Sequence, residues 1–344
     1  MPALFVFGDS FVDTGNVPYL TKQGAPFPYG TSPRNEYVVS GRFSNGLILP
    51  DYLSQMLGLS ALSHPFLEPN ASWYYGCNFA FSGSGALQAG TNPGPLPEQT
   101  TAFKDFVGNA TLYWRNVQQS GFSSELSVVP RYPRPEFFAG GLYLIVIGAN
   151  DVLPIRGNMS IVNDVAASLQ STLQTIYNLG GRNFVVASPI DFGCIPFAIN
   201  GNKGFCTNWE EAISSALGEA YRSLLASLQT KLSGATFLYL DLYNLTRTNS
   251  SNAQPLGFPE PHRACCGAGG PANIDAQCGT PLATSCIDPG RHVYWDNIHF
   301  STDFASALAR EIFAGNTYIR PKNVMQAFVL PQLEATFASL EGRI

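Results

Sequence analysis

The sequence predicts an α/β fold built around a parallel β-sheet. Short apolar runs alternate with longer stretches of helical periodicity, which is typical of repeated β-α units. One run, residues 142–147, reads L-Y-L-I-V-I without polar alternation, as expected of a strand covered by helices on both faces. Hydrophobic residues make up 45% of the chain and charged residues only 12%, a balance that allows a sizeable core. We expect five strands, at residues 4–7, 75–80, 142–147, 183–188 and 236–241.

Helices are expected in the gaps between these strands. The third has Ser160 as a candidate N-cap and the Gly180-Gly181 pair as its stop. The fourth opens with a capping-box pattern from Thr207 to Glu210. The pattern predicts five helices, at residues 47–57, 99–118, 161–179, 208–232 and 302–313.

The chain contains no linker long enough to separate two domains, so we expect one domain over residues 1–344. Residues 244–295 form an insertion rich in Gly, Pro and Asn without clear periodicity. A loop of that length inside a compact domain is usually functional or covalently tied. The four cysteines of the insertion would supply the ties.

Six of the seven cysteines fall into two loop clusters, which we interpret as disulfide-bonded. The spacing does not fix the pairing. A zinc site is the alternative for the second cluster, although it lacks paired C-x-x-C units and a histidine at ligand spacing. Cys77 lies in a strand-like run and is expected to be a buried free thiol. The disulfide candidates are Cys194 and Cys206 in the first cluster and Cys265, Cys266, Cys278 and Cys286 in the second.

Composition also limits the partners. A formal net charge of −5 without a basic cluster argues against nucleic acid, and no apolar stretch reaches the ~18 residues of a membrane span. Five N-x-S/T acceptors indicate N-glycans and passage through the secretory pathway. No signal-peptide pattern precedes Leu4, so the expectation of secretion rests on the acceptors and the cysteines. The acceptors are Asn70, Asn109, Asn158, Asn244 and Asn249.

Two segments at opposite ends of the chain carry the parts of a catalytic triad. The first strand ends in F-G-D-S-F, which places Ser10 on the turn at its carboxyl end, where open α/β sheets bind ligands. The segment W-D-N-I-H supplies Asp296 and His299 three positions apart. A serine hydroxyl needs an adjacent base, and the base needs a third group to orient it. We expect the other three histidines, His64, His262 and His292, to be surface residues.

Two further segments follow expected strands. The segment G-A-N-D, residues 148–151, offers the Asn150 amide as a donor to an oxyanion, or as part of a simple Asx-turn. The segment N-F-A-F-S-G-S-G, residues 78–85, contains glycines that allow the backbone to approach a ligand closely.

Taken in order, the four segments resemble the GDSL (SGNH) esterase/lipase family, and the match spans residues 5–299. The segments P-Y-G at 28–30, G-R-F-S-N-G at 41–46 and A-C-C-G at 264–267 are similar to the plant branch of that family. Two positions depart from the family pattern. Phe11 replaces the leucine that names the family, a change that we expect to affect packing more than chemistry, and F-S-G-S-G replaces S-G-G-A-G.

The resemblance implies a three-layer α/β/α, flavodoxin-like fold with a five-stranded parallel sheet. It implies a carboxylic ester hydrolase that forms an acyl-enzyme on Ser10, with His299 as base and Asp296 as its orienter. Its oxyanion donors would be the Ser10 N-H, the Gly83 N-H and the Asn150 side chain. Gly85 is the alternative to Gly83 if the turn is shifted. The family needs no cofactor and no metal.

Two other functions use the same residues. An acyltransferase would pass the acyl group to an alcohol instead of water, and a carbohydrate- or lipid-binding relative would have lost the chemistry. The plant-type resemblance points to the apoplast or cell wall as the location. The sequence leaves the ester open among acetylated polysaccharide, lipid and small phenolic esters.

Overall fold

A computed structural model describes residues 1–31, 41–87, 94–120, 129–153, 158–250 and 256–334, apart from the side chains of residues 248–250. All five expected strands are present in a central sheet, with ends that differ from the prediction by at most two residues. Their side chains are buried almost throughout, because helices cover both faces of the sheet. The strands are β1 (Leu4–Gly8), β2 (Gly76–Asn78), β3 (Leu142–Val146), β4 (Asn183–Ala187) and β5 (Thr236–Leu240).

The expectation of a five-stranded, all-parallel sheet is wrong. The sheet has six strands in the order β2-β1-β3-β4-β5-β9, and β9 (Ile319–Arg320) runs antiparallel to β5. A strand of two residues carries no readable periodicity, so the sequence gives no sign of it. The other five strands are parallel.

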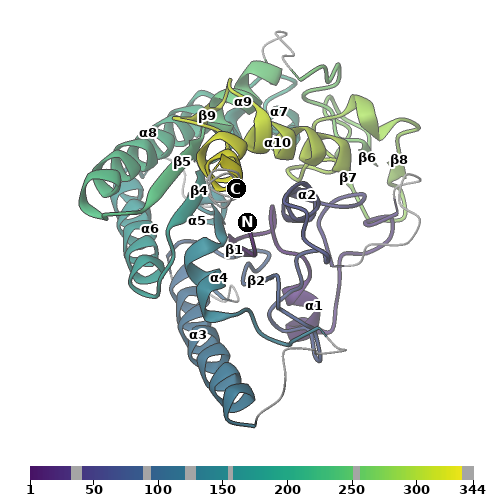
Figure 1. The fold of residues 1–344 in the computed structure, drawn as a ribbon. Helices are drawn as coiled ribbons and strands as arrows, with labels where there is room; N and C mark the ends of the chain where they lie inside the picture. The colour runs from purple at the N-terminus through teal and green to yellow at the C-terminus, as the bar shows by residue number, and fades with distance from the viewer. Residues whose placement is uncertain (32–40, 88–93, 121–128, 154–157, 251–255, 335–344) are drawn as a thin grey trace.

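Helices form a layer on each side of this sheet (Figure 1). On one side α6 packs between α3 and α8, and on the other side α2 packs against α10. These five correspond to the predicted helices, and their bounds are α2 (Leu49–Met56), α3 (Leu96–Gln119), α6 (Ile161–Asn178), α8 (Asn208–Lys231) and α10 (Thr302–Ala314). Shorter helices that the periodicity did not predict are α1 (Asn16–Thr21), α4 (Pro135–Gly140), α5 (Ala149–Val152), α7 (Pro196–Gly201) and α9 (Leu242–Ser250).

Of the predicted helix ends, the stop of α6 is confirmed, the capping box of α8 is wrong, and the N-cap of α6 has the expected residue without the expected bond. Helix α6 stops as expected, since the Gly181 N-H caps the Ile176 carbonyl at 2.9 Å and Gly180 takes a φ of 108°. The capping box is wrong: no side-chain cap bond forms at the start of α8, and the Thr207 hydroxyl is buried without a partner in the described part of the chain. Ser160 occupies the N-cap of α6 but bonds Asn158 instead of the helix.

The insertion at 244–295 is more ordered than its composition suggests. Helix α9 extends into it, and three short strands form an antiparallel sheet, at the right of Figure 1. Two disulfides, Cys265–Cys286 and Cys266–Cys278, tie this sheet, so these cysteines bind each other and not zinc. The strands are β6 (Cys266–Ala268), β7 (Ala276–Gln277) and β8 (Thr284–Ser285).

The remaining cysteines also agree with the prediction. Cys194 pairs with Cys206, and Cys77 is a buried free thiol. Among the described residues, no helix combines the length and the apolar character that crossing a membrane requires.

Candidate active site

Ser10 lies on a tight turn after β1, at the carboxyl end of the sheet. Gly8 makes the turn possible, because its φ is 150° and a Cβ there would lie 2.0 Å from the Val146 carbonyl oxygen. The turn is closed by Asp9, whose carboxylate accepts the Phe11 N-H at 3.1 Å. Ser10 is therefore held on a rigid support with its hydroxyl partly exposed.

The three residues that the sequence singled out as a triad are brought together. His299 Nε2 lies 2.9 Å from Ser10 Oγ, and His299 Nδ1 lies 2.7 Å from Asp296 Oδ2. Asp296 and His299 belong to the segment that leads into α10, while Ser10 comes from the first strand. Such a chain of hydrogen bonds can remove the proton from a serine hydroxyl and hold the imidazole in one orientation.

Asp296 is buried and strongly hydrogen-bonded. Its Oδ1 accepts the N-H groups of Ile298 at 2.9 Å and His299 at 2.7 Å. Burial alone would raise the pKa of Asp296, but the charge of His299 and the hydrogen bonds from its neighbours outweigh it and lower that pKa. The carboxylate therefore stays ionised opposite the imidazole.

Tyr29 is a further contact of this carboxylate. Its hydroxyl donates to Asp296 Oδ2 at 2.6 Å. Burial and the charge of Asp296 raise the pKa of Tyr29, so the tyrosine keeps its proton and remains a donor. The sequence does not mark Tyr29 as a site residue, and the only signal is its place in the P-Y-G segment that is similar to the plant branch of the family.

Three hydrogen-bond donors face the same cleft as Ser10 Oγ. Within the described residues, neither the Ser10 N-H nor the Gly83 N-H has a hydrogen-bond partner. Asn150 Nδ2 donates one of its two hydrogens to the Ser84 carbonyl at 2.9 Å, which leaves the other free. Ser10, Gly83 and Asn150 all line the cleft, and backbone N-H groups and side-chain amides are the kinds of donor that form oxyanion holes.

The two glycines of the second segment have different surroundings. A Cβ on Gly83 would meet nothing within 4 Å, although its φ of 86° favours glycine, and Gly83 lines the cleft. Gly85 is buried, and a Cβ there would lie 2.6 Å from Asp151 Oδ1. Gly83 is thus available to a ligand, whereas Gly85 allows close packing against Asp151.

Two buried aspartates that the sequence analysis left without a role hold this loop in place. Asp13 Oδ2 accepts both the N-H of Ser82 at 2.8 Å and its hydroxyl at 2.9 Å. Asp151 accepts the N-H groups of Ala86 at 2.7 Å and Leu87 at 2.9 Å. Burial raises the pKa of both carboxyls. Asp151 follows Asn150 directly, so these bonds tie the Asn150 helix to the loop of Gly83.

The cleft has a volume of about 570 Å³ and is lined mainly by apolar side chains. Phe11 lines it, and its ring centroid lies 5.7 Å from that of His299 and 5.1 Å from that of Phe300. Phe11 therefore contacts the site as well as the core. The other apolar side chains of the cleft are Val17, Phe43, Ala149, Leu153, Ile195, Phe197 and Ile298.

The other three histidines lie in different surroundings. His64 pairs with Glu68 at 2.7 Å, and His262 lies 3.4 Å from the Cys194 carbonyl. His292 bonds the Arg263 carbonyl at 2.9 Å and is buried, so its expected place at the surface is wrong. In the part of the chain that the structure describes, no cluster of three or more His, Cys, Asp or Glu side chains could hold a metal ion.

Comparison with known proteins identifies the family of this chain. Residues 4–312 match the model of the GDSL-like lipase/acylhydrolase family. A GDSL esterase/lipase of Arabidopsis thaliana is 31% identical, with 91% of this chain and 88% of that protein aligned. Acetylajmalan esterase 2 of Rauvolfia serpentina is also 31% identical, over 87% of this chain and 86% of the relative. A solved structure of a Bacillus subtilis protein has a TM-score of only 0.36 and 15% sequence identity. The alignment covers 90% of this chain and 54% of the Bacillus chain. The chain belongs to the GDSL-like lipase/acylhydrolase family and is a carboxylic ester hydrolase.

Proposed function

We propose that the chain is a secreted serine esterase in which Ser10 attacks the ester carbonyl, His299 takes the serine proton and Asp296 orients His299. The observation that carries this proposal is the hydrogen-bonded chain from Ser10 Oγ through both imidazole nitrogens to Asp296 Oδ2. Because the two ends of the sequence supply the triad, we treat residues 1–344 as one catalytic domain.

The reaction proceeds in two steps. The serine oxygen bonds to the carbonyl carbon, the ester C-O bond breaks, and His299 delivers the proton to the departing alcohol. Water then attacks the acyl-enzyme, His299 takes a proton from it, and the carboxylic acid and free Ser10 are released. In both steps the oxyanion is bound by the Ser10 N-H, the Gly83 N-H and Asn150 Nδ2.

The substrate we propose is an ester of a short acyl group. The apolar lining of the 570 Å³ cleft suits an acyl group and leaves its open side for a larger alcohol. The name of the relative acetylajmalan esterase 2 describes the cleavage of an acetyl ester. Among the classes that the sequence left open, acetylated polysaccharides and acetylated small molecules fit this choice better than long-chain lipids.

Disulfides and exposed N-glycosylation acceptors support secretion. Three disulfides form, and such bonds persist in oxidising compartments. Four N-glycosylation acceptors, Asn70, Asn109, Asn158 and Asn244, are exposed. The side chain of the fifth, Asn249, lies outside the described residues. We propose that the protein is an extracellular glycoprotein.

The test compares hydrolysis of p-nitrophenyl acetate, butyrate and octanoate by the wild type and by Ser10→Ala and His299→Ala. We expect kcat/KM to fall by at least about 10⁴-fold in each variant. Ser82→Ala is the matched control, since Ser82 lines the same cleft but bonds Asp13, and it should lose less than about tenfold. Full activity in Ser10→Ala would overturn the proposal, and a preference for octanoate would overturn the choice of acyl group.

A further inference from the structure

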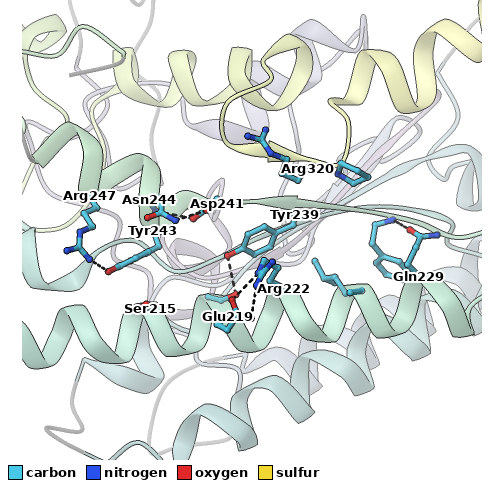
Figure 2. Close-up of a pocket in the computed structure, with 15 residues that line it drawn as sticks. Ser215, Glu219, Arg222, Gln229, Tyr239, Asp241, Tyr243, Asn244, Arg247 and Arg320 are labelled. Carbon is cyan, nitrogen blue, oxygen red and sulfur yellow. Dashed lines mark hydrogen bonds and ion pairs between the residues drawn. The ribbon is translucent and has the colours of Figure 1, made fainter. Parts of the chain in front are cut away.

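A second groove lies away from the triad, at the β5 and β9 edge of the central sheet (Figure 2). It has a volume of about 900 Å³, and α8 forms one wall while β5, β9 and the start of α9 form the other. None of its lining residues lines the cleft of Ser10. The ester hydrolysis proposed above therefore leaves this groove without a use.

Each arginine that lines the groove already has a hydrogen-bond partner. Arg222 Nε and Nη2 each lie 2.9 Å from a Glu219 carboxylate oxygen, and Arg247 pairs with Glu211 outside the lining and bonds the Tyr243 hydroxyl. Arg320 Nη1 donates to the Ile319 carbonyl at 2.9 Å. Three carboxylates, those of Glu211, Glu219 and Asp241, balance the three guanidinium groups, so the groove has little net charge and favours a polar, neutral ligand over an anion.

Two tyrosines and several hydrogen-bonding side chains line the groove. Figure 2 shows the Tyr239 ring between Arg222 on α8 and Arg320 on β9, with Tyr243 and Asp241 further along. Gln229 lies at the opposite end; its Oε1 accepts the Phe237 N-H at 3.0 Å and its Nε2 donates to the Ala235 carbonyl at 2.8 Å, which leaves one amide hydrogen for a ligand. Tyrosine presents an apolar ring and a polar tip, and sugars likewise have apolar ring faces and many hydroxyls. The lining therefore fits a carbohydrate chain.

An acceptor for such a carbohydrate chain lies among the residues that line the groove. Asn244 begins the acceptor N-L-T, is exposed, and itself lines the groove. Its Nδ2 donates to Asp241 Oδ2 at 2.8 Å, and a glycosylated amide keeps one hydrogen with which to make this bond. A glycan attached here is tethered at the groove and binds it at high effective concentration.

We propose that this groove is the docking site of the N-linked glycan on Asn244. The inference rests on the proposed passage through the secretory pathway and not on the triad. The docked glycan would cover the outer edge of the sheet, where β9 pairs with β5 through only two residue pairs, Tyr239 with Arg320 and Leu240 with Ile319. Covering so short an edge strand protects it from opening and from pairing with another chain.

The first experiment uses protein secreted from a eukaryotic host, with occupancy read by glycopeptide mass spectrometry. The comparison is between wild type, Asn244→Gln and Asn109→Gln, an exposed acceptor on α3 that does not line the groove. We expect amide hydrogen exchange in β5, β9 and the groove-facing half of α8 to rise by at least about tenfold in Asn244→Gln and to stay unchanged in Asn109→Gln. Wild type made without glycosylation should show the same amide hydrogen exchange as Asn244→Gln. This control separates the effect of losing the glycan from the effect of losing the Asn244 bond to Asp241.

The second experiment leaves the acceptor intact and changes the groove. In the double variant Arg222→Ala, Tyr239→Phe, a peptide N-glycosidase should release the Asn244 glycan from the folded protein several-fold faster than from wild type, with no change at Asn109. An unoccupied Asn244 beside occupied Asn109 would overturn this inference alone. Equal release rates from wild type and the double variant, together with unchanged hydrogen exchange in Asn244→Gln, would also overturn this inference alone. A chain without any glycan would contradict the proposed secretion. Activity toward esters tests the triad independently.

Discussion

The Tyr29 hydroxyl donates to Asp296 Oδ2 at 2.6 Å, the same carboxylate oxygen that His299 Nδ1 approaches to 2.7 Å. With the two backbone N-H groups on Oδ1, the carboxylate has four hydrogen-bonding partners. Tyr29 thereby joins the early part of the chain to the segment that carries two of the proposed catalytic residues. We infer that it positions Asp296 without contacting the substrate.

Replacing Tyr29 with phenylalanine should weaken this support. Since the hydrogen bond from Tyr29 helps to lower the pKa of Asp296, its loss raises that pKa, and the carboxylate takes up a proton at a higher pH. We expect kcat/KM to fall by about 3- to 30-fold at neutral pH and the acid limb of its pH profile to move to higher pH.

Tyr143→Phe is the control for this variant. Its hydroxyl is also buried and donates to a carbonyl, that of Phe138, at 2.7 Å, but it lies at the start of β3. It should lower the free energy of unfolding without moving the pH profile. An unchanged acid limb in Tyr29→Phe would remove Tyr29 from the site.

The proposed oxyanion donors predict a selective loss in kcat. Asn150→Ala removes one donor from the cleft and should lower kcat by about 10²- to 10³-fold, with a smaller effect on KM. Asn183→Ala is the matched control, since its amide also donates to backbone carbonyls, those of Ala139 and Gly141, at the opposite end of the sheet. If both variants lose the same small factor, Asn150 has only the structural role of its bond to Ser84.

The central strands, and the proximity of Ser10 to Asp296 and His299, could be predicted because the apolar runs and short motifs behind them are local signals. A continuous apolar run such as β3 must be covered on both faces, and the order of four short segments along the chain is specific even where each alone is weak. Gly83 and Gly85 could not be separated in this way, because the difference between them is the carboxylate of Asp151, which packs beside only one of them.

The parts that the sequence did not reveal depend on contacts between distant residues. Tyr29 meets Asp296 across 267 positions, and Asp13 meets Ser82 across 69. β9 forms only because β5 offers an open edge, since its own two residues have no periodic pattern. The prediction of a capping box was wrong although its local pattern is present, because no side-chain cap bond forms at the start of α8.

Asp9 predicts a dependence of stability on pH. It is 1% exposed, and its Oδ2 has no hydrogen-bond partner among the described residues. Burial raises the pKa of Asp9 to about 7, against the opposing effects of the Phe11 N-H and the charge of His299. Between about pH 4 and pH 7 the folded chain keeps a proton here that the unfolded chain releases, so this group makes folding less favourable as the pH rises.

Asp9→Asn removes this titration and can keep the bond that Oδ1 accepts from Phe11. In urea unfolding at pH 5 and pH 8, we expect the stability of the variant relative to wild type to increase by about 2 to 3 kcal/mol between the two values. The exposed Asp105→Asn should show no such increase. Parallel pH dependences for wild type and Asp9→Asn would show that Asp9 does not titrate in this range.

Two of the disulfides close segments of equal length beside different parts of the proposed active site. Removing each of them should therefore affect catalysis differently. Cys194–Cys206 and Cys266–Cys278 each span a separation of 12 residues, so removing either should cost about 3 kcal/mol through the unfolded chain. Their native neighbours differ. The Cys266 N-H donates to the Trp295 carbonyl at 2.6 Å, directly before Asp296, whereas Cys194 precedes Ile195 in the apolar lining of the cleft.

We therefore expect the paired serine variants to separate in their kinetics. Cys266→Ser with Cys278→Ser should lower kcat, because β6, which hydrogen-bonds the residue before Asp296, is no longer tied by the disulfide to Cys278. Cys194→Ser with Cys206→Ser should mainly raise KM. Steady-state hydrolysis of p-nitrophenyl acetate, measured well below both melting temperatures, provides the comparison. An identical change in both variants would mean that the disulfides act only on global stability and that the Asp296 segment is held by its other contacts.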